Sequence, residues 1–254
     1  MQFKVAGCSV ALLVIILTGT GCKKFEKPGK VNQPGIVVTF DDNYVDNWFH
    51  YLPTLDSLGI RGTFYISNYN RLTADQRNKL MVIQNHGHEI AYHSVNHYNM
   101  VDYLYKYHHT MDELMQKEIL PGLTLMNKDG FFPKTFAYPF GQHCGALDNA
   151  LMRYFKSVRA LNGTFDYTKS LVPTDKNQLL YGLGLDKSSK NSDATIDKVL
   201  QSAANNNNCA VFVAHKINVT NTDMMVSLQR LKKLAARASE LNLKFYTASE
   251  ISAN

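Results

Sequence analysis

The chain is poor in several features that mark particular protein classes. Its 254 residues include four cysteines and one tryptophan, and 19% are charged. This ordinary globular composition excludes collagen-like, disordered and disulfide-scaffold proteins. No run of lysine and arginine with interleaved aromatics occurs, and no repeat of fixed period is found. The net charge of +6 lies mostly in residues 1–34, and residues 35–254 hold 22 basic against 20 acidic residues. We therefore expect no nucleic-acid partner.

The N-terminus has the pattern of an export signal. Lys4 precedes the apolar run Val5–Leu17, which is too short to span a bilayer comfortably, and small residues lead to Cys22. The ending Gly19-Thr20-Gly21-Cys22 resembles a bacterial lipoprotein processing site, although Gly19 stands where leucine is usual, and ordinary signal cleavage is the alternative. The resemblance implies a signal peptide over 1–21, acylation of Cys22, and an envelope protein anchored to a membrane by lipid. Residues 22–34, rich in Lys, Pro and Gly, are typical of a flexible tether.

Two cysteines remain after the leader and Cys22 are set aside. Cys144 and Cys209 are 65 residues apart and lack the spacing of a metal site. An exported compartment permits them to pair, so a disulfide and two separate thiols are both open.

From residue 35 onward, short apolar runs alternate with helical patterns, which indicates one βα barrel or an open α/β sheet. Continuous apolar runs are typical of parallel strands buried on both faces. The predicted strands are 36–40, 62–67, 89–92, 134–138, 157–160, 179–185, 209–214 and 243–247. Helices are predicted around Leu52–Leu58, after the capping box Thr73–Gln76, and from Asn221 or Thr222 to Leu241. Residues 98–127 are less regular and predict an inserted helical excursion broken at Pro121-Gly122.

Chemistry-bearing residues follow several of the predicted strands. Asp41-Asp42 ends the first strand, where one carboxylate can bind a cation and the other can act as a base; the alternative is a helix N-cap pair. His93 and His97 stand four residues apart, a spacing that lets one segment supply two metal ligands. His86 and His88 are competitors, but a structural role is favoured for His88 at the start of its strand. The other histidines, His50, His108, His109 and His143, carry no site pattern.

Two further strand ends carry candidate groups. Tyr138-Pro139-Phe140-Gly141 forms a turn that can direct a backbone N–H into a site and stabilise an oxyanion, or that simply ends a strand. His215 follows the apolar segment Val211–Ala214, where it is either a general acid or a packed core histidine.

Together these four elements resemble the polysaccharide deacetylase family, also called carbohydrate esterase family 4 or the NodB-homology domain. Thr39–Asp42, His93–His97, Tyr138–Gly141 and Phe212–His215 are similar to its motifs in order and separation, and the resemblance covers about residues 35–250. It implies a single distorted (β/α)7–8 barrel over residues 35–254.

The resemblance also implies the roles of individual residues. Asp42, His93 and His97 would hold one divalent metal ion, commonly Zn²⁺, and Asp41 would be the base that deprotonates water. His215 would be the acid, and the Phe140 N–H would share the oxyanion. The implied activity is metal-dependent removal of acetyl groups, N-acetyl rather than O-acetyl, from an acetylated envelope or extracellular polysaccharide. We expect a monomeric carbohydrate deacetylase.

Two departures from the family pattern bear on this expectation. Ala137 stands where many members have an arginine that orients the base, and the usual Asp/Trp-containing fourth motif is not recognisable. Arg153 or Arg159 is a candidate replacement for the cation, and Asp166 or Asp186 is a candidate partner for His215. A glycan-binding lipoprotein without turnover and a hydrolase of a non-sugar amide therefore remain as alternatives. Aromatics beside the metal would favour sugars, and the candidates are Trp48, Tyr44, Tyr98 and Tyr103.

Overall fold

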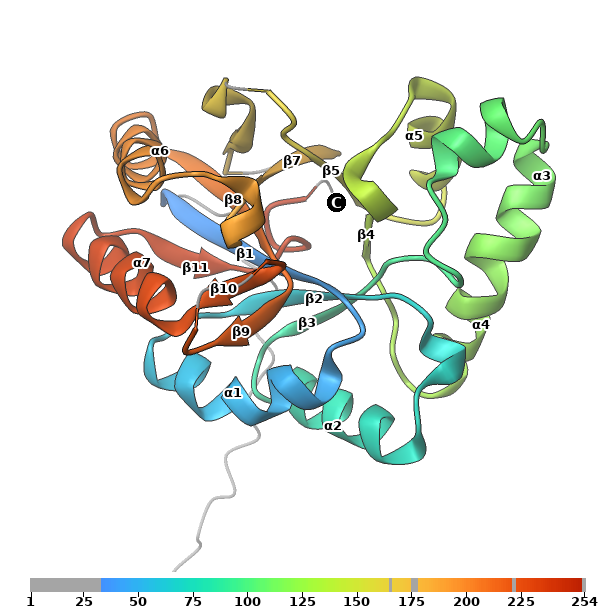
Figure 1. Ribbon diagram of the computed structural model, residues 1–254, viewed down its shortest axis with the longest axis horizontal. Coiled ribbons are helices and arrows are strands. Elements are labelled where there is room, and N and C mark those ends of the chain that lie inside the picture. Colours follow the sequence, from blue (N-terminus) through green and yellow to red (C-terminus); the bar gives the residue numbers. More distant parts are fainter. Residues whose placement is uncertain (1–32, 165, 175–177, 221–222, 253–254) are drawn as a thin grey trace, which may run out of the picture.

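A closed barrel of parallel strands forms the centre of the molecule (Figure 1). The computed structural model describes residues 33–164, 166–174, 178–220 and 223–252. Within these residues, seven parallel strands follow one another around the barrel, and β1 also pairs with β8 and closes it. They are β1 (Gly35–Asp42), β2 (Gly62–Ile66), β3 (Glu89–Tyr92), β4 (Thr135–Ala137), β5 (Ser157–Leu161), β7 (Leu179–Gly184) and β8 (Asn208–Ala214). The expected α/β barrel is confirmed.

Four short strands complete the sheets. β11 (Lys244–Tyr246) lies parallel to the first half of β1, and β6 (Leu171–Pro173) lies antiparallel to β8. β9 (Lys216–Asn218) and β10 (Met225–Ser227) form a separate parallel pair. All eight predicted strands are present, and β6, β9 and β10 were not predicted, since three-residue strands leave little periodicity in a sequence.

Helices surround the barrel and cover its outer face (Figure 1). Those of nine or more residues are α1 (Val45–Ser57), α2 (Ala74–Asn85), α4 (Leu120–Lys128), α6 (Asp193–Asn205) and α7 (Leu228–Glu240); α5 (Gly145–Leu151) is shorter. The predicted capping box is confirmed, because Thr73 Oγ1 accepts from Gln76 N while Gln76 Oε1 accepts from Thr73 N. None of the helices in the described ranges has the length and apolarity needed to cross a membrane.

The start of the last helix was predicted wrongly. The apolar spacing placed Met225 inside this helix, but Met225 belongs to β10, and the helix begins at Leu228 after its N-cap Ser227. Pairing with β9 outweighs the helical periodicity there, because tertiary contacts override local propensity. Asn221 and Thr222 lie outside the described residues, as do residues 1–32 with the expected signal peptide and Cys22. Gln33 and Pro34, at the end of the expected tether, hydrogen-bond to Asn242 and Lys244.

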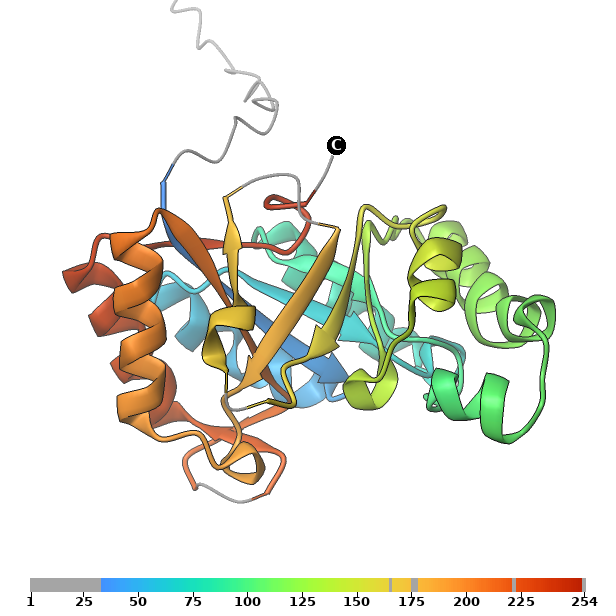
Figure 2. The ribbon, with the colours of Figure 1, turned by 90° about the horizontal axis from the view of Figure 1, so that it is seen from above.

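The irregular segment beyond β3 is the expected helical excursion. It contains two π-helical stretches, η2 (Asp102–Lys106) and η3 (Met115–Ile119), with α3 (Met111–Leu114) between them and α4 after them. Figure 2 shows this excursion on one side of the barrel and α6 and α7 on the other. Pro121-Gly122 does not break a helix, because Pro121 lies in the first turn of α4, where proline is tolerated. Gly122 packs so closely on Tyr92 that an added Cβ would lie 2.2 Å from its hydroxyl.

Alternation along the strands decides which side chains enter the barrel. Neighbouring side chains on a strand face opposite sides. Val37, Tyr65, Ala91 and Val211 belong to a small buried cluster separate from the main core between strands and helices, which fits their place inside the barrel. Asp41 and His215 follow Val37 and Val211 by four residues, and His93 follows Ala91 by two. The same alternation therefore brings Asp41, His93 and His215 to the interior at the carboxyl ends of β1, β8 and β3.

Candidate metal centre

The two carboxylates that end β1 point to the site rather than cap a helix. The N-cap residue of α1 is Tyr44, and no side chain caps this helix, so the N-cap interpretation of Asp41-Asp42 is wrong. Asp42 has φ of 87°, a conformation that non-glycine residues rarely adopt. This turn of the backbone follows the inward-facing Asp41, and it allows two adjacent residues to line one cavity. Strain of this kind persists where the surrounding structure holds it, often at functional sites.

His93 and His97 lie on the loop after β3 and meet Asp42. His97 Nε2 lies 3.2 Å from Asp42 Oδ1, and His93 Nε2 lies 3.8 Å from the same oxygen. Ser94 and His97 have φ of 71° and 59°, so a tight loop, not a helical turn, presents both imidazoles. The His97 N–H donates to Ser94 Oγ at 3.0 Å, which fixes the loop.

The donor set of this cluster fits a divalent cation. One ligand atom from each of Asp42, His93 and His97 lies within 4.8 Å of the others. His93 Nδ1 donates to the carbonyl of Ala137 at 2.7 Å, which leaves its Nε2 lone pair for a metal, as is typical of metal-bound imidazoles. Burial lowers the pKa of His93 to about 4, so the ring is neutral near pH 7. Burial alone would raise the pKa of Asp42, but the hydrogen bond to His97 and the nearby histidines outweigh it and lower this pKa to about 2.

Asp41 is held by a buried arginine. Arg159 Nη2 on β5 donates to both carboxylate oxygens of Asp41, and both side chains are buried. Ala137 of β4 is the direct cross-strand partner of Arg159 on β5. The arginine that is missing at position 137 is therefore replaced by Arg159, which reaches Asp41 from the neighbouring strand. A Cβ at Gly182 on β7 would lie 2.1 Å from Val213 Cγ2 and 3.3 Å from Arg159 Cδ, so this glycine leaves room mainly for Val213 and also for the arginine side chain. Of the two arginines considered from the sequence, Arg159 is confirmed and the exposed Arg153 is not.

His215 has its own carboxylate partner. His215 Nδ1 lies 2.5 Å from Asp186 Oδ2, and Trp48 Nε1 donates to the His215 carbonyl at 2.8 Å. Burial would lower the pKa of His215, but the bond to Asp186 and the charges of Asp41 and Asp42 prevail and raise it above its usual value. Asp166 instead caps its own turn through Thr168. Of the two candidate partners of His215 considered from the sequence, Asp186 is therefore the one that contacts it.

The turn after β4 places Phe140 at the rim of the site. Phe140 has φ of 60°, and its ring centroid lies 4.9 Å from that of His97. Phe140, Leu161 and Met224 are exposed apolar residues that line a cavity of about 530 Å³. Asp41, Asp42, His93, His97, Asp186 and His215 line the same cavity. The structure thus brings together the candidate metal ligands, base, acid and oxyanion residue expected from the sequence. Cys22 lies outside the described residues.

The remaining histidines and cysteines lie away from this centre. His88 is buried and accepts from Gly62 N through Nδ1 at 3.0 Å, which confirms its structural role. His143 pairs with Asp148, and His109 stacks on Tyr103. Cys144 and Cys209 are free thiols, and no disulfide joins them.

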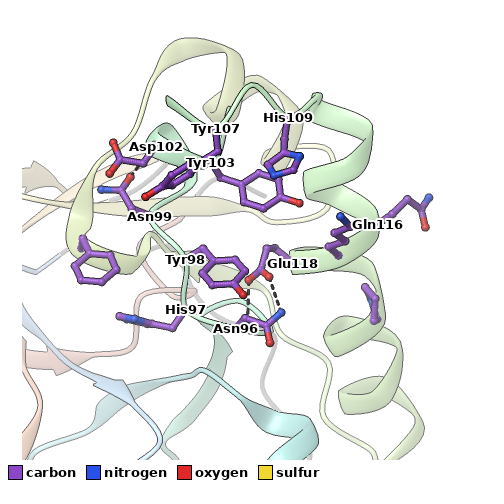
Figure 3. A pocket seen from close by; sticks show the side chains of 13 residues that line it. Asn96, His97, Tyr98, Asn99, Asp102, Tyr103, Tyr107, His109, Gln116 and Glu118 are labelled. Atoms are coloured by element: carbon purple, nitrogen blue, oxygen red, sulfur yellow. Dashed lines mark hydrogen bonds between the residues drawn. The ribbon is translucent and has the colours of Figure 1, made fainter. Parts of the chain in front are cut away.

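Sequence reasoning missed one residue that shapes the loop of ligands. Glu118 of η3 is completely buried, and its carboxylate accepts from the Asn96 backbone N–H and side-chain amide at 2.9 and 2.7 Å. Its carbonyl accepts from Val95 N at 3.0 Å. This contact, drawn in Figure 3, joins residues 22 positions apart, and Glu118 lies in an irregular helical segment. The periodicity of the sequence therefore could not predict it.

The fold and this cluster define a class: α/β barrels with an Asp-His-His group at the carboxyl ends of their strands that can hold a metal ion. Residues 29–154 match the family of polysaccharide deacetylases. No curated protein matches the chain in sequence.

Solved structures share the fold. A family 4 carbohydrate esterase from Streptomyces lividans in complex with acetate is 17% identical, with a TM-score of 0.58 and coverage of 85% of this chain and 94% of that one. The peptidoglycan deacetylase PdaC from Bacillus subtilis is 16% identical, with a TM-score of 0.56 over 89% and 91%. The chitin deacetylase from Colletotrichum lindemuthianum is 15% identical, with a TM-score of 0.58 over 88% and 89%. The chain is therefore similar to polysaccharide deacetylases over residues 29–154, and it shares the fold of these solved structures.

Proposed function

We propose that the protein is a metal-dependent hydrolase that removes acetyl groups from a cell-envelope or extracellular polysaccharide. One observation carries the proposal: Asp41 and His215 line the cavity of the Asp42–His93–His97 cluster. Asp41 is paired with a cation, and His215 is paired with a carboxylate. Arg159 stabilises the carboxylate of Asp41, and Asp186 stabilises the protonated form of His215. A carboxylate bonded to a buried guanidinium and an imidazole bonded to a carboxylate, both facing one cavity, are the pattern of a base and an acid.

Asp42, His93 and His97 would hold the metal ion. Two imidazoles and one carboxylate with open positions are typical of a catalytic zinc site, so Zn²⁺ is the proposed ion. When bound, the ion supplies Lewis-acid character at the acetyl carbonyl.

The chain's own residues account for both proton movements. Asp41 accepts a proton from the attacking water as the new C–O bond forms, and Arg159 keeps the carboxylate in place. The Phe140 N–H donates to the carbonyl oxygen as it gains negative charge. His215 donates its proton to the leaving nitrogen as the C–N bond breaks. Acetate and a free amine are the products.

The proposed substrate carries N-acetyl groups. An amine leaves an acyl carbon only after its nitrogen is protonated, and the raised pKa of His215 keeps that proton available near neutral pH. An ester oxygen needs this assistance less.

Two alternatives were left open by the sequence. A glycan-binding protein without turnover was suggested by Ala137 and the missing fourth motif. Arg159 supplies a cation to Asp41 and Asp186 supplies a carboxylate to His215, so both supporting contacts are present from other positions. Hydrolysis of a non-sugar amide would need no aromatic groove. Trp48 is buried in the core and is no sugar platform, whereas Tyr98 is exposed near the site.

Acetate release tests the proposal. Purified residues 23–254 are incubated with N-acetylglucosamine oligomers and acetylated xylo-oligosaccharides, and metal content is measured on the same sample. We expect acetate release that stops with a chelator and returns with Zn²⁺ or Co²⁺. One bound ion per chain without acetate from any substrate would favour the glycan-binding alternative.

We also propose the location. The monomeric enzyme would be attached to a bacterial envelope membrane by lipid on Cys22, after removal of residues 1–21, with residues 22–34 as tether before the catalytic domain 35–254. Mass spectrometry of the mature N-terminus and fractionation of Cys22→Ala test this. A variant that stays in the membrane fraction would contradict it.

A further inference from the structure

His215 follows the last strand pairing of β8. Ala214, the final residue of β8, pairs with Phe40 of β1, and β9 begins at Lys216. Among the described residues β9 pairs only with β10, so it lies outside the barrel sheet. A general acid must lie within hydrogen-bond reach of the atom that receives its proton. The place of the His215 imidazole therefore depends on contacts beyond the strand ladder.

Two adjacent residues of helix α1 supply such contacts. Trp48 Nε1 donates to the His215 carbonyl at 2.8 Å. The Asn47 amide nitrogen donates to the Ile217 carbonyl at 2.9 Å, and the Asn47 side-chain oxygen accepts from Ile217 N at 2.8 Å. Asn47 and Trp48, here called the α1 clamp, thus bond three backbone groups on the two sides of Lys216. Figure 1 shows α1 alongside β9.

Burial makes the bonds of the α1 clamp hard to replace. Trp48 is fully buried, and Ile217 is 1% exposed. A buried backbone group that loses its partner has no water to turn to, so the chain must move before the group finds another. The rings of Phe64 and Tyr44 lie beside the Trp48 ring, with centroids 5.1 and 6.3 Å away, and keep the indole in its direction. The indole is therefore a fixed support for the segment that carries the acid.

The same helix follows the end of β1 that carries the base and a metal ligand. α1 begins at Val45, three residues after Asp42. Lys216 Nζ lies 4.3 Å from the centroid of the Tyr44 ring, which adds a contact between the start of α1 and the residue after His215. The α1 clamp therefore ties the acid to the segment that carries the rest of the reacting groups.

The imidazole itself is held from the other side. Asp186 Oδ2 contacts His215 Nδ1 at 2.5 Å, and Asp186 Oδ1 accepts from His215 N at 3.4 Å. Asp186 orients the ring, whereas Trp48 fixes the carbonyl of the same residue. Neither Asn47 nor Trp48 lines the metal-site cavity, so both act through the backbone of residues 215–217 and not through the substrate.

We propose that Asn47 and Trp48 are positioning residues for the general acid, which hold the His215 imidazole where its proton reaches the leaving nitrogen. The inference rests on the proposed deacetylase function. Loss of either side chain displaces the acid and slows delivery of the proton. The metal ligands and the attack of water on the acetyl carbon do not depend on the α1 clamp.

The test uses a difference between leaving groups. An amine leaves an acyl carbon only after protonation, whereas the nitrophenolate of a nitrophenyl acetate leaves without a proton. The variants are Trp48→Phe, which keeps an aromatic ring and removes the N–H, and Asn47→Ala. Ser57→Ala is the matched control, because Ser57 Oγ also donates to a backbone carbonyl, that of Thr54, at the other end of α1. Metal content, kcat and KM for N-acetylglucosamine hexamer and for nitrophenyl acetate are measured on the full chain with Zn²⁺ present.

We expect each variant to lower kcat for the hexamer roughly 10- to 100-fold, because a displacement of about 1 Å costs a catalytic group up to this factor. The hexamer KM, the metal content and the aryl ester rate should stay within about twofold of the unaltered protein. His215→Ala should show the same pattern, and adding Trp48→Phe to it should cause no further loss. Ser57→Ala should match the unaltered protein. Equal losses with both substrates, or full amide turnover in both variants, would overturn the inference.

A spectroscopic measurement tests the clamp without any turnover. Trp48 is the chain's only tryptophan, so its indole N–H gives one NMR signal whose exchange with deuterated water can be timed. We expect slow exchange in the unaltered protein and in Ser57→Ala. Exchange should be about tenfold faster or more in Asn47→Ala, because the carbonyl that accepts from the indole is then free to move. Unchanged exchange in Asn47→Ala would contradict the clamp.

Failure of the clamp and failure of the proposed function give different results. Chelator-sensitive hydrolysis of nitrophenyl acetate without acetate from any N-acetyl substrate contradicts the deacetylase, and the indole exchange then decides on the clamp by itself. Acetate release from the hexamer that responds to neither variant contradicts the clamp alone.

Discussion

Removing the charge of Arg159 tests the central ion pair most directly. Arg159 is fully buried and Asp41 is 4% exposed, so Arg159→Met leaves a carboxylate away from water without its cation. Breaking a buried pair on one side costs about 3–5 kcal/mol. At about 2–4 °C per kcal/mol for a domain of this size, Tm should fall by roughly 6–20 °C.

The double variant Arg159→Met/Asp41→Asn shows whether the cost comes from the unpaired charge. Arg159 Nε and Nη1 have no partner among the described residues, so the guanidinium is already incompletely paired. Replacing both charges should therefore recover most of the stability lost in Arg159→Met, as a double-mutant cycle would show. Urea unfolding is measured with chelator present, since a bound cation would itself stabilise Asp41. Additive losses, or a loss below about 1 kcal/mol in Arg159→Met, would refute the reasoning.

Three further predictions concern the site. Asp41→Asn should keep metal content near one ion per chain while kcat falls about a hundredfold or more, because the general base is lost; full activity would remove Asp41 from the mechanism. His93→Ala or His97→Ala should lose metal and activity together, as metal analysis and acetate release would show, and retained metal would contradict the ligand set. Asp186→Asn should shift the alkaline limb of the pH–rate profile to lower pH, because Asp186 helps to raise the pKa of His215; an unchanged limb would contradict this. In stability, the raised pKa means that the His215–Asp186 interaction contributes fully below pH ~6.5 and is lost as pH rises through the folded-state value.

Local pattern was enough to predict most elements of the barrel. The continuous apolar runs at β1, β2 and β8 have the composition of strands buried on both faces, and all three were predicted. The start of α7 was not, because strand β10 depends on its pairing with β9 rather than on its own three residues. Short elements held by tertiary contacts leave too little periodicity to predict.

Two candidate ligands, Asp42 and His93, and the candidate acid His215 could be found because each follows a predicted strand. Parallel strands end at the same edge of a barrel, so Asp42, His93 and His215 were expected to converge from their positions alone. The roles of Arg159 and Asp186 stayed open among alternatives. A pairing across 118 residues, as between Asp41 and Arg159, depends on register and on side-chain length, which no local pattern contains.

The amino-acid sequence by itself determined the α/β class with parallel strands and the positions of the ligand candidates, because continuous apolar runs, helical periodicity and the spacing of His93 and His97 are local properties. The choice of a closed barrel over an open sheet came from the family resemblance. Only the tertiary structure decided that Arg159 reaches Asp41 from the neighbouring strand and that Glu118 joins η3 to the His97 loop. It also decided that the irregular excursion forms an aromatic cavity beside the site. These features depend on the meeting of distant segments, and their energies come from burial and charge in the assembled fold.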